Sequence, residues 1–154
     1  MMKKNKIFFI VNALHSKKNK NLKKLIRTKF LSEKYDVNIL ISEYKGHCIK
    51  LAEEAVEKKA NIVVACGGDG TVNEVGQSLI KKPVLLGVIP LGSGNGFARH
   101  FNIPRNLNYA LDIISKNFST TIDVGKINKR FFFSNFGLGV EAKFIEEYSK
   151  IKTR

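Results

Sequence analysis

Apolar and polar positions follow one another along this chain in blocks that have the lengths of strands and helices. Largely apolar runs at 7–11, 62–65 and 83–90 predict buried strands, and Val37, Ile39 and Ile41 recur at strand spacing. The strand–helix–strand–helix order with short connections predicts an α/β fold, an open parallel sheet flanked by helices. The apolar residues that recur at helical spacing are Leu22, Leu25, Ile26 and Phe30; Leu51, Ala52, Ala55 and Val56; Val72, Val75, Leu79 and Ile80; and Leu107, Ala110, Leu111 and Ile114.

The pattern changes after about residue 119. Residues 121–124 and 130–135 flank a polar turn at 125–129 and predict a β-hairpin. We therefore place a domain boundary near Ser119, with an α/β domain at 1–119 and the beginning of a β domain at 120–154. An isolated hairpin rich in phenylalanine is marginally stable and leaves strand edges unpaired, so we expect residues 120–154 to dock, to be lost to protease or, preferably, to form a homo-oligomer.

The most informative segment is a glycine-rich turn at 66–70, which follows a buried strand and opens a helix. Thr71 and Glu74 have the spacing of a capping box, which predicts that the helix begins at Thr71. The free N–H groups and positive dipole at such a helix end favour a phosphate, and glycines let it approach the backbone. The alternative is a tight turn with a good cap and no ligand.

Asp69 lies in the middle of this turn. A carboxylate repels phosphate unless something cancels its charge, so it suggests Mg²⁺ or a hydroxyl whose proton it accepts. We expect Asp69→Asn to remove the Mg²⁺-dependence of nucleotide binding with little change in stability. Gly68→Ala and Gly70→Ala should harm folding or binding through Cβ clashes. The spacing matches neither a Walker loop nor a dinucleotide fingerprint.

A second glycine-rich turn at 92–96 also follows a strand and precedes a helix. If the two strands are neighbours, both turns face one crevice at the carboxyl edge of the sheet, where open α/β sheets bind ligands.

Residues 67–75 resemble the GGDGTxxEV signature of the diacylglycerol kinase catalytic family, and residues 92–104 resemble its second signature, GTGNDFAR or GSGNxLARxxxxP. NAD kinases share GGDGT and are similar to the first stretch alone. Residues 137–142 resemble the GxGFDA stretch of the family's second, all-β domain, with Glu141 in place of Asp. The resemblance covers nearly the whole chain, which has about half the family's length.

This resemblance implies an ATP-binding, Mg²⁺-dependent lipid kinase of phospholipid metabolism. It implies that Asp69 is the catalytic and metal-positioning residue, and that the base for the acceptor hydroxyl comes from the second domain, beyond Arg154. Asn12 is the least secure contact, because the Asn-Pro-x-Ser-Gly of the family is Asn-Ala-Leu-His-Ser here; Ser42 could equally be a plain strand-end hydroxyl. The implied nucleotide contacts are Asn12, Ser42, Gly67, Gly68, Asp69, Gly70, Thr71, Val72, Asn73, Glu74, Gly92, Ser93, Gly94 and Asn95.

Charge and cysteine content limit the expected binding partners and cellular location. The 154 residues include 27 Lys plus Arg against 13 Asp plus Glu, a formal charge of +14, which favours an anionic partner. We expect ATP and a lipid at an anionic membrane surface, and no specific nucleic acid. Two cysteines without metal spacing favour a reducing, cytoplasmic location, peripheral to the membrane at most. No apolar run approaches the roughly 18 residues that cross a bilayer.

Two function classes stay open besides an NAD kinase relative. The first is the ATP-binding domain of a diacylglycerol or sphingosine kinase-like enzyme, inactive as a 154-residue fragment. The second is a non-catalytic nucleotide-binding or membrane-surface module.

Overall fold

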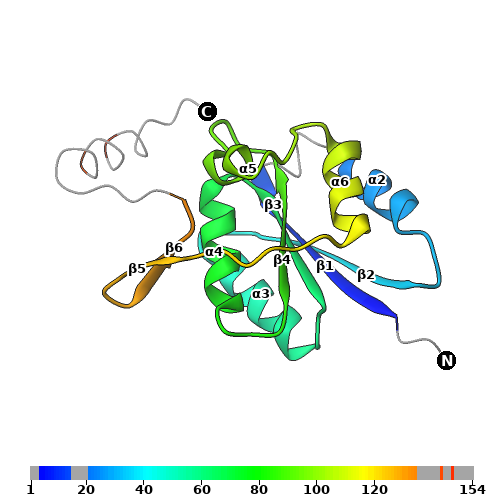
Figure 1. The fold of residues 1–154 in the computed structure, drawn as a ribbon, viewed down its shortest axis with the longest axis horizontal. Coiled ribbons are helices and arrows are strands. Elements are labelled where there is room, and N and C mark those ends of the chain that lie inside the picture. The colour runs from blue at the N-terminus through cyan, green and yellow to red at the C-terminus, as the bar shows by residue number, and fades with distance from the viewer. Residues whose placement is uncertain (1–3, 15–20, 135–142, 144–146, 148–154) are drawn as a thin grey trace.

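A parallel sheet forms the centre of the molecule (Figure 1). The computed structural model describes residues 4–14, 21–134, 143 and 147. Its four-stranded sheet has the order β2-β1-β3-β4, built from β1 (Asn5–Val11), β2 (Tyr35–Ile41), β3 (Ile62–Gly67) and β4 (Leu85–Pro90). All three pairings are parallel. The prediction of an open parallel sheet is confirmed.

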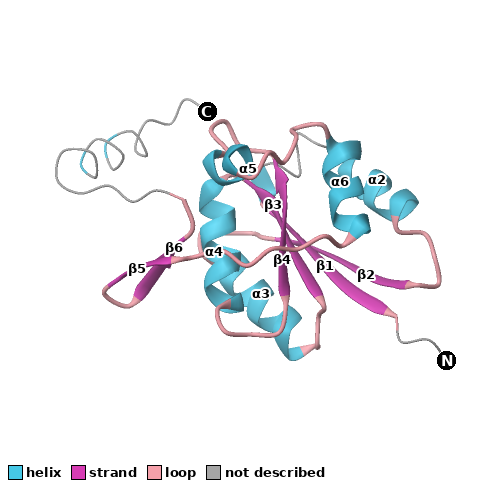
Figure 2. Ribbon diagram, viewed as in Figure 1, coloured by secondary structure: helices cyan, strands magenta, loops and turns pink. Residues whose placement is uncertain are grey.

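Helices cover both faces of this sheet (Figure 2). Alternate residues of the buried strands point to opposite faces, so Phe8 and Ile10 pack in one core cluster and Ile7 and Phe9 in the other. The first cluster contains apolar residues of α3 (His47–Glu57), α4 (Asp69–Leu79) and α5 (Gly96–His100). The second contains those of α2 (Leu22–Lys29) and α6 (Leu107–Lys116). The helical periodicities therefore mark the faces that pack on the sheet.

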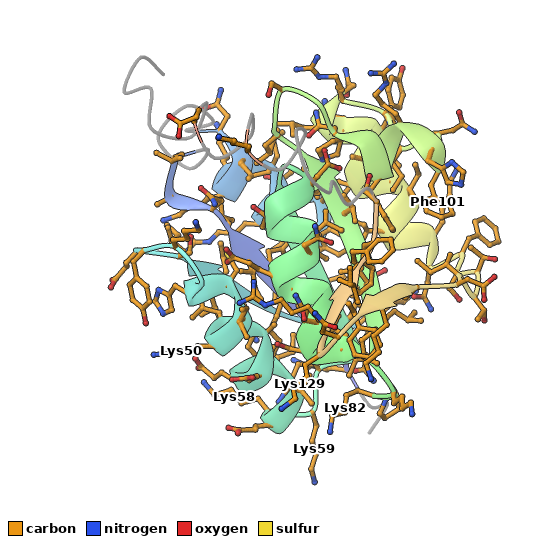
Figure 3. All side chains as sticks on the ribbon, turned by 90° about the vertical axis from the view of Figure 1, so that its left-hand side faces the viewer. Lys50, Lys58, Lys59, Lys82, Phe101 and Lys129 are labelled. Carbon is orange, nitrogen blue, oxygen red and sulfur yellow. The ribbon has the colours of Figure 1, made fainter. Side chains whose placement is uncertain are left out.

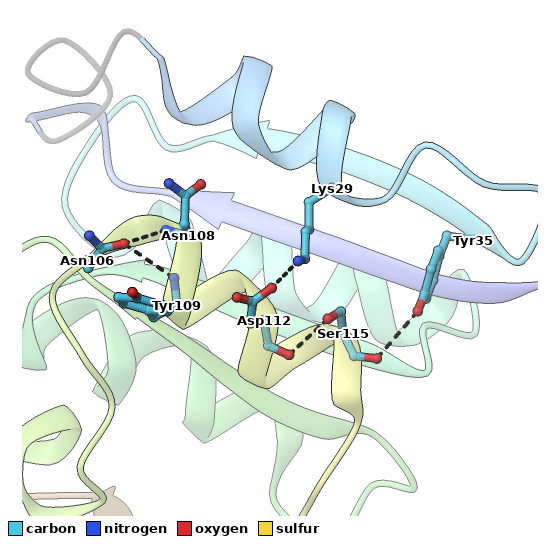
Figure 4. Close-up of polar contacts among 7 residues, drawn as sticks. All are labelled: Lys29, Tyr35, Asn106, Asn108, Tyr109, Asp112 and Ser115. Carbon is cyan, nitrogen blue, oxygen red and sulfur yellow. Dashed lines mark hydrogen bonds and ion pairs between the residues drawn. The ribbon is translucent and has the colours of Figure 1, made fainter.

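An ion pair joins α2 to α6, and a side-chain cap begins α6 (Figure 4). Lys29 pairs with Asp112. The side chain of Asn106 caps α6, where its Oδ1 accepts the N–H groups of Asn108 (3.0 Å) and Tyr109 (3.4 Å). These contacts fix the layer that lies opposite α3 and α4.

The predicted C-terminal hairpin is present, but its first strand lies further along the chain than predicted. Its strands are β5 (Gly125–Ile127) and β6 (Arg130–Phe132), which pair antiparallel, so the first strand follows residues 121–124 instead of containing them. The shift arises because Asn128, with φ of 52°, provides the left-handed residue for a short turn.

The hairpin lies beside α4 (Figure 1). The N–H of Phe133 donates to Asn73 Oδ1 (2.9 Å), and the Phe133 ring packs over Gly76 and near the ring of Phe97. This part of 120–154 therefore docks within the chain. The boundary at 119 and the homo-oligomer stay predictions, and the 137–142 stretch lies outside the described residues.

Candidate functional site at the carboxyl edge of the sheet

The loops that carry the predicted site residues meet at one edge of the central sheet, because its four strands are parallel. The N–H of Asn12 donates to the carbonyl of Cys66 (3.1 Å), and the N–H of Ala13 donates to Ser42 Oγ (3.3 Å). Strands β3 and β4 are neighbours, with Gly67 opposite Pro90. The expected convergence of the two glycine-rich turns is thus confirmed.

The two turns touch through glycine backbones. A Cβ built on Gly92 would lie 2.6 Å from the Cα of Gly68, and one on Gly68 would lie 3.3 Å from the Cα of Gly92. Real Cβ atoms do not approach backbone atoms as closely as 2.6 Å, so the contact requires glycine at 92. The glycines that were expected to let a ligand approach therefore also let the two turns pack closely against each other.

The helix after the first turn begins earlier than the sequence predicted. Its cap is Gly68, in an extended conformation (φ −94°, ψ −170°), and α4 starts at Asp69 instead of Thr71. The capping-box prediction is wrong, because Glu74 Oε1 accepts the N–H of Gly46 (3.1 Å) from the loop after β2. Thr71, 5% exposed, points inward beneath Gly67.

Asp69 bridges the two turns. Its Oδ2 accepts the N–H of Gly96 (2.9 Å) and its Oδ1 accepts the N–H of Phe97 (2.9 Å). These donors are the first two N–H groups of α5, which have no acceptor within their own helix. The amide dipoles offset the carboxylate charge that raised the question of Mg²⁺. These two bonds argue against the expectation that Asp69→Asn leaves stability almost unchanged, since Asp69 holds the start of α5.

The second turn is closed by its own side chain. Asn95, which is 3% exposed and has φ of 53°, accepts the N–H of Gly92 through Oδ1 (2.9 Å) and donates through Nδ2 to the Gly92 carbonyl (2.7 Å). Both polar atoms of the Asn95 side chain are therefore used to shape the loop. Ser93 and Gly94 at its tip are exposed.

The open part of the first turn is Gly70. A Cβ built there meets nothing within 4 Å, so the expected clash of Gly70→Ala with the protein is wrong. Its N–H and that of Asp69 belong to the first turn of α4, where no carbonyl four residues earlier can accept them. Gly70 is exposed, so a ligand can reach this backbone.

Other predicted contacts are buried or already bonded within the protein. Val72 is 2% exposed in the core, and Asn73 Oδ1 is bonded to the hairpin. Asn12 Oδ1 accepts the N–H of Leu14 (3.1 Å), which shapes its own loop. Ser42 is 3% exposed at the end of β2. The lysines at 17, 18 and 20, which could add charge near Asn12, lie outside the described residues.

Sequence reasoning missed two features near the crevice. It gave no role to the exposed Tyr44, whose ring stacks on the partly buried ring of His47 at the start of α3, although an aromatic residue three positions before a histidine was a visible signal. It also missed that Ser42 and Glu74 flank Cys48, whose pKa is raised to about 11 by burial first and by the Glu74 charge, against the lowering effect of the Ser42 hydrogen bond. Cys48 is therefore a protonated thiol at neutral pH.

The acidic groups of the crevice do not form a ready-made cation site. Within the part of the chain that the structure describes, no three His, Cys, Asp or Glu side chains gather as a metal site. Mg²⁺ is commonly held by one or two carboxylates together with substrate phosphates, and each oxygen of Asp69 has a further lone pair. The donor set therefore fits Mg²⁺ that arrives with a nucleotide. No helix of the described residues is long and apolar enough to cross a membrane.

The fold and its paired turns define a class, the parallel α/β proteins with glycine-rich turns at the carboxyl edge of the sheet. The family model described as the diacylglycerol kinase catalytic domain matches residues 6–127. The chain therefore belongs to the diacylglycerol kinase catalytic domain family.

Known proteins similar to this chain carry kinase names. It is 34% identical over 142 residues to "Probable lipid kinase YegS-like" of Pectobacterium atrosepticum, covering 90% of this chain and 47% of that protein. It is 39% identical over 102 residues to a diacylglycerol kinase of Staphylococcus aureus, covering 65% and 32%. A crystal structure of a diacylglycerol kinase from Bacillus anthracis superposes with a TM-score of 0.71 at 28% identity, covering 86% and 47%. The chain thus spans about half the length of these relatives, or less.

Proposed function

We propose that this chain is the nucleotide-binding part of a lipid kinase, and that it binds the phosphates of ATP at the two glycine-rich turns. The observation that carries the proposal is the exposed backbone at Gly70, in the first turn of α4; the neighbouring Asp69 reaches the second turn, where a Cβ on Gly94 would lie 3.5 Å from Asp69 Oδ2. Unpaired N–H groups and the positive end of the α4 dipole favour phosphate there. The hydroxyl of Ser93 would add a neutral donor.

Transfer of the γ-phosphoryl group depends mostly on positioning and on charge neutralisation. Mg²⁺, bound with ATP, would supply that neutralisation, and Asp69 would hold it directly or through water while keeping α5 in place. The deprotonation of an acceptor hydroxyl is a separate task. Because Asp69 is occupied with two amides, we expect these residues alone to bind ATP with little turnover.

A lipid acceptor at an anionic membrane is supported by the names of the relatives and by the charge of +14. Lysines are exposed on the described surface: Figure 3 shows Lys50, Lys58 and Lys59 projecting from α3 and from its C-terminal end. Such charges attract acidic lipid headgroups, an effect that salt weakens.

The test is a calorimetric titration of Mg-ATP into the wild-type chain and into Gly70→Ala. The new methyl group has free space in the protein, so the melting temperature should stay the same or rise slightly. It would stand where phosphate approaches, so ATP should bind at least about tenfold more weakly. An unchanged ATP affinity in a folded Gly70→Ala protein would contradict the proposal.

A further inference from the structure

Two stacked aromatic rings, one of them exposed, lie at the same edge of the sheet as the glycine-rich turns. The rings of Tyr44 and His47 are parallel, with an interplanar angle of 2° and centroids 4.4 Å apart. Tyr44 is 53% exposed, although a tyrosine that served only to cover the loop would bury its ring. Tyr44 therefore presents a flat π surface to solvent.

The loop holds this pair in a fixed orientation. The N–H of Glu43 donates to His47 Nδ1 (3.0 Å), and the N–H of His47 donates to the Tyr44 carbonyl (3.2 Å). Because Nδ1 accepts this hydrogen bond, the Glu43 N–H fixes the rotation of the imidazole ring. Gly46 supplies the left-handed residue, with φ of 83°, that the turn between Tyr44 and His47 requires.

The loop is also tied to the phosphate-binding turn. The N–H of Gly46 donates to Glu74 Oε1 (3.1 Å), and Glu74 lies on α4, the helix that begins at Asp69. Strands β2 and β3 are separated by β1 alone. At about 4.8 Å between strands, their carboxyl ends lie about 10 Å apart, a distance that the ribose and phosphates of one nucleotide span.

The charge next to the pair suits a nucleotide. Lys50 Nζ lies 5.7 Å from the centroid of the Tyr44 ring, near the outer limit of a cation–π contact. Figure 3 shows Lys50 at the outer side of α3. Its flexible stem lets the ammonium move aside or toward a polyanion.

We propose that Tyr44, backed by His47, is the platform on which the purine base of the nucleotide stacks. This inference rests on the proposed binding of ATP phosphates at the glycine-rich turns and adds the site that recognises the base. Stacking on an aromatic ring accepts any base with a π face, so the platform contributes affinity and leaves the choice between ATP and GTP to other contacts.

The experiment compares two ligands, Mg-ATP and inorganic tripolyphosphate with Mg²⁺, by calorimetry. Tyr44→Ala should weaken ATP binding about tenfold and leave tripolyphosphate binding unchanged, because only ATP carries a base. Tyr44→Phe keeps the ring and should bind ATP as the wild type does. Tyr109→Ala is the matched control, since Tyr109 is 64% exposed on α6 (Figure 4) and should affect neither ligand.

A nuclear magnetic resonance measurement on the wild-type chain makes the test independent of how the variants fold. In the ATP complex, nuclear Overhauser contacts are expected between the purine H8 or H2 and the ring protons of Tyr44. Their absence, or full ATP affinity in Tyr44→Ala, would overturn the inference while ATP binding and its loss in Gly70→Ala left the proposed function standing. Equal losses of ATP and tripolyphosphate in Tyr44→Ala would also overturn it. A wild-type chain that binds neither ligand would overturn both.

Discussion

The two glycine-rich turns look alike in the sequence but differ in what holds them. The second turn is closed on itself by the buried side chain of Asn95, and its helix, α5, is five residues long. The first turn has no such internal staple, and it opens an eleven-residue helix, α4, with Gly70 facing free space. The second turn therefore supports the first, and the first turn offers a backbone surface that a ligand can reach.

The two turns show that glycines in one sequence signature can be required for two different reasons. At Gly92 the missing Cβ admits the backbone of Gly68, so the residue is required by the protein itself. At Gly70 no protein atom needs the space, so any requirement for glycine there must come from a ligand. Substitutions at these positions should therefore separate stability from binding.

The largest effect is expected for Gly92→Ala. Its methyl group would meet the Cα of Gly68 at 2.6 Å and Asn95 Oδ1 at 2.9 Å. The first is backbone, and the second belongs to a buried side chain that two hydrogen bonds hold in place. We expect a loss of about 3 kcal/mol in the free energy of unfolding, measured by chemical denaturation. Gly94→Ala is the control, because its Cβ would lie 3.5 Å from Asp69 Oδ2, an ordinary contact. Equal stability of the two variants would mean that the contact between Gly92 and Gly68 does not require glycine at 92.

The second effect concerns the bridge between the turns. In Asp69→Asn an amide group faces two N–H donors, so one of the bonds to Gly96 and Phe97 is replaced by a clash of donors. Thermal or chemical unfolding should show a loss of about 2 kcal/mol. Asp112→Asn is the matched control, since the partly exposed pair of Asp112 with Lys29 should contribute well below 1 kcal/mol.

Ligand binding by Asp69→Asn sharpens the same comparison. If Asp69 also holds Mg²⁺, the folded variant should bind ATP with the same affinity with and without Mg²⁺. A variant as stable as wild type would mean that α5 starts without Asp69, and the bridging role would be discarded.

The sequence predicted the architecture of this site better than its contacts. Apolar runs and helical spacing identify strands and helices because burial imposes them residue by residue, and parallel strands bring Asn12, Ser42 and both turns to one edge. The two partners of Asp69, Gly96 and Phe97, lie 27 and 28 residues further along the chain. Their identity depends on how α5 packs. Local spacing suggested a capping box at Thr71 and Glu74, but tertiary contacts placed both residues elsewhere.

The smallest effect concerns Cys66, the buried residue of β3 that directly precedes the glycines of the first turn. It is fully buried, and burial raises its pKa above the usual range of a thiol; the pKa of Cys48 is raised from 9.0 to about 11. Since the folded state binds these protons more tightly than the unfolded chain, their contribution to stability is complete below pH 9. For Cys48 it is lost as pH rises from about 9 to about 11.

The burial of the two thiols can be measured as their rate of alkylation, followed by mass spectrometry. At pH 8 iodoacetamide should leave both thiols of the folded wild-type protein unmodified over a time in which the denatured chain reacts fully, because the thiolate is the nucleophile. Gly92→Ala should speed the reaction of Cys66 through local opening of the turns above it. Cys48, at the start of α3, should change less and serves as the internal reference. If Cys66 in the wild type reacts as fast as in the denatured chain, the first turn opens without help, and the second turn does not support it.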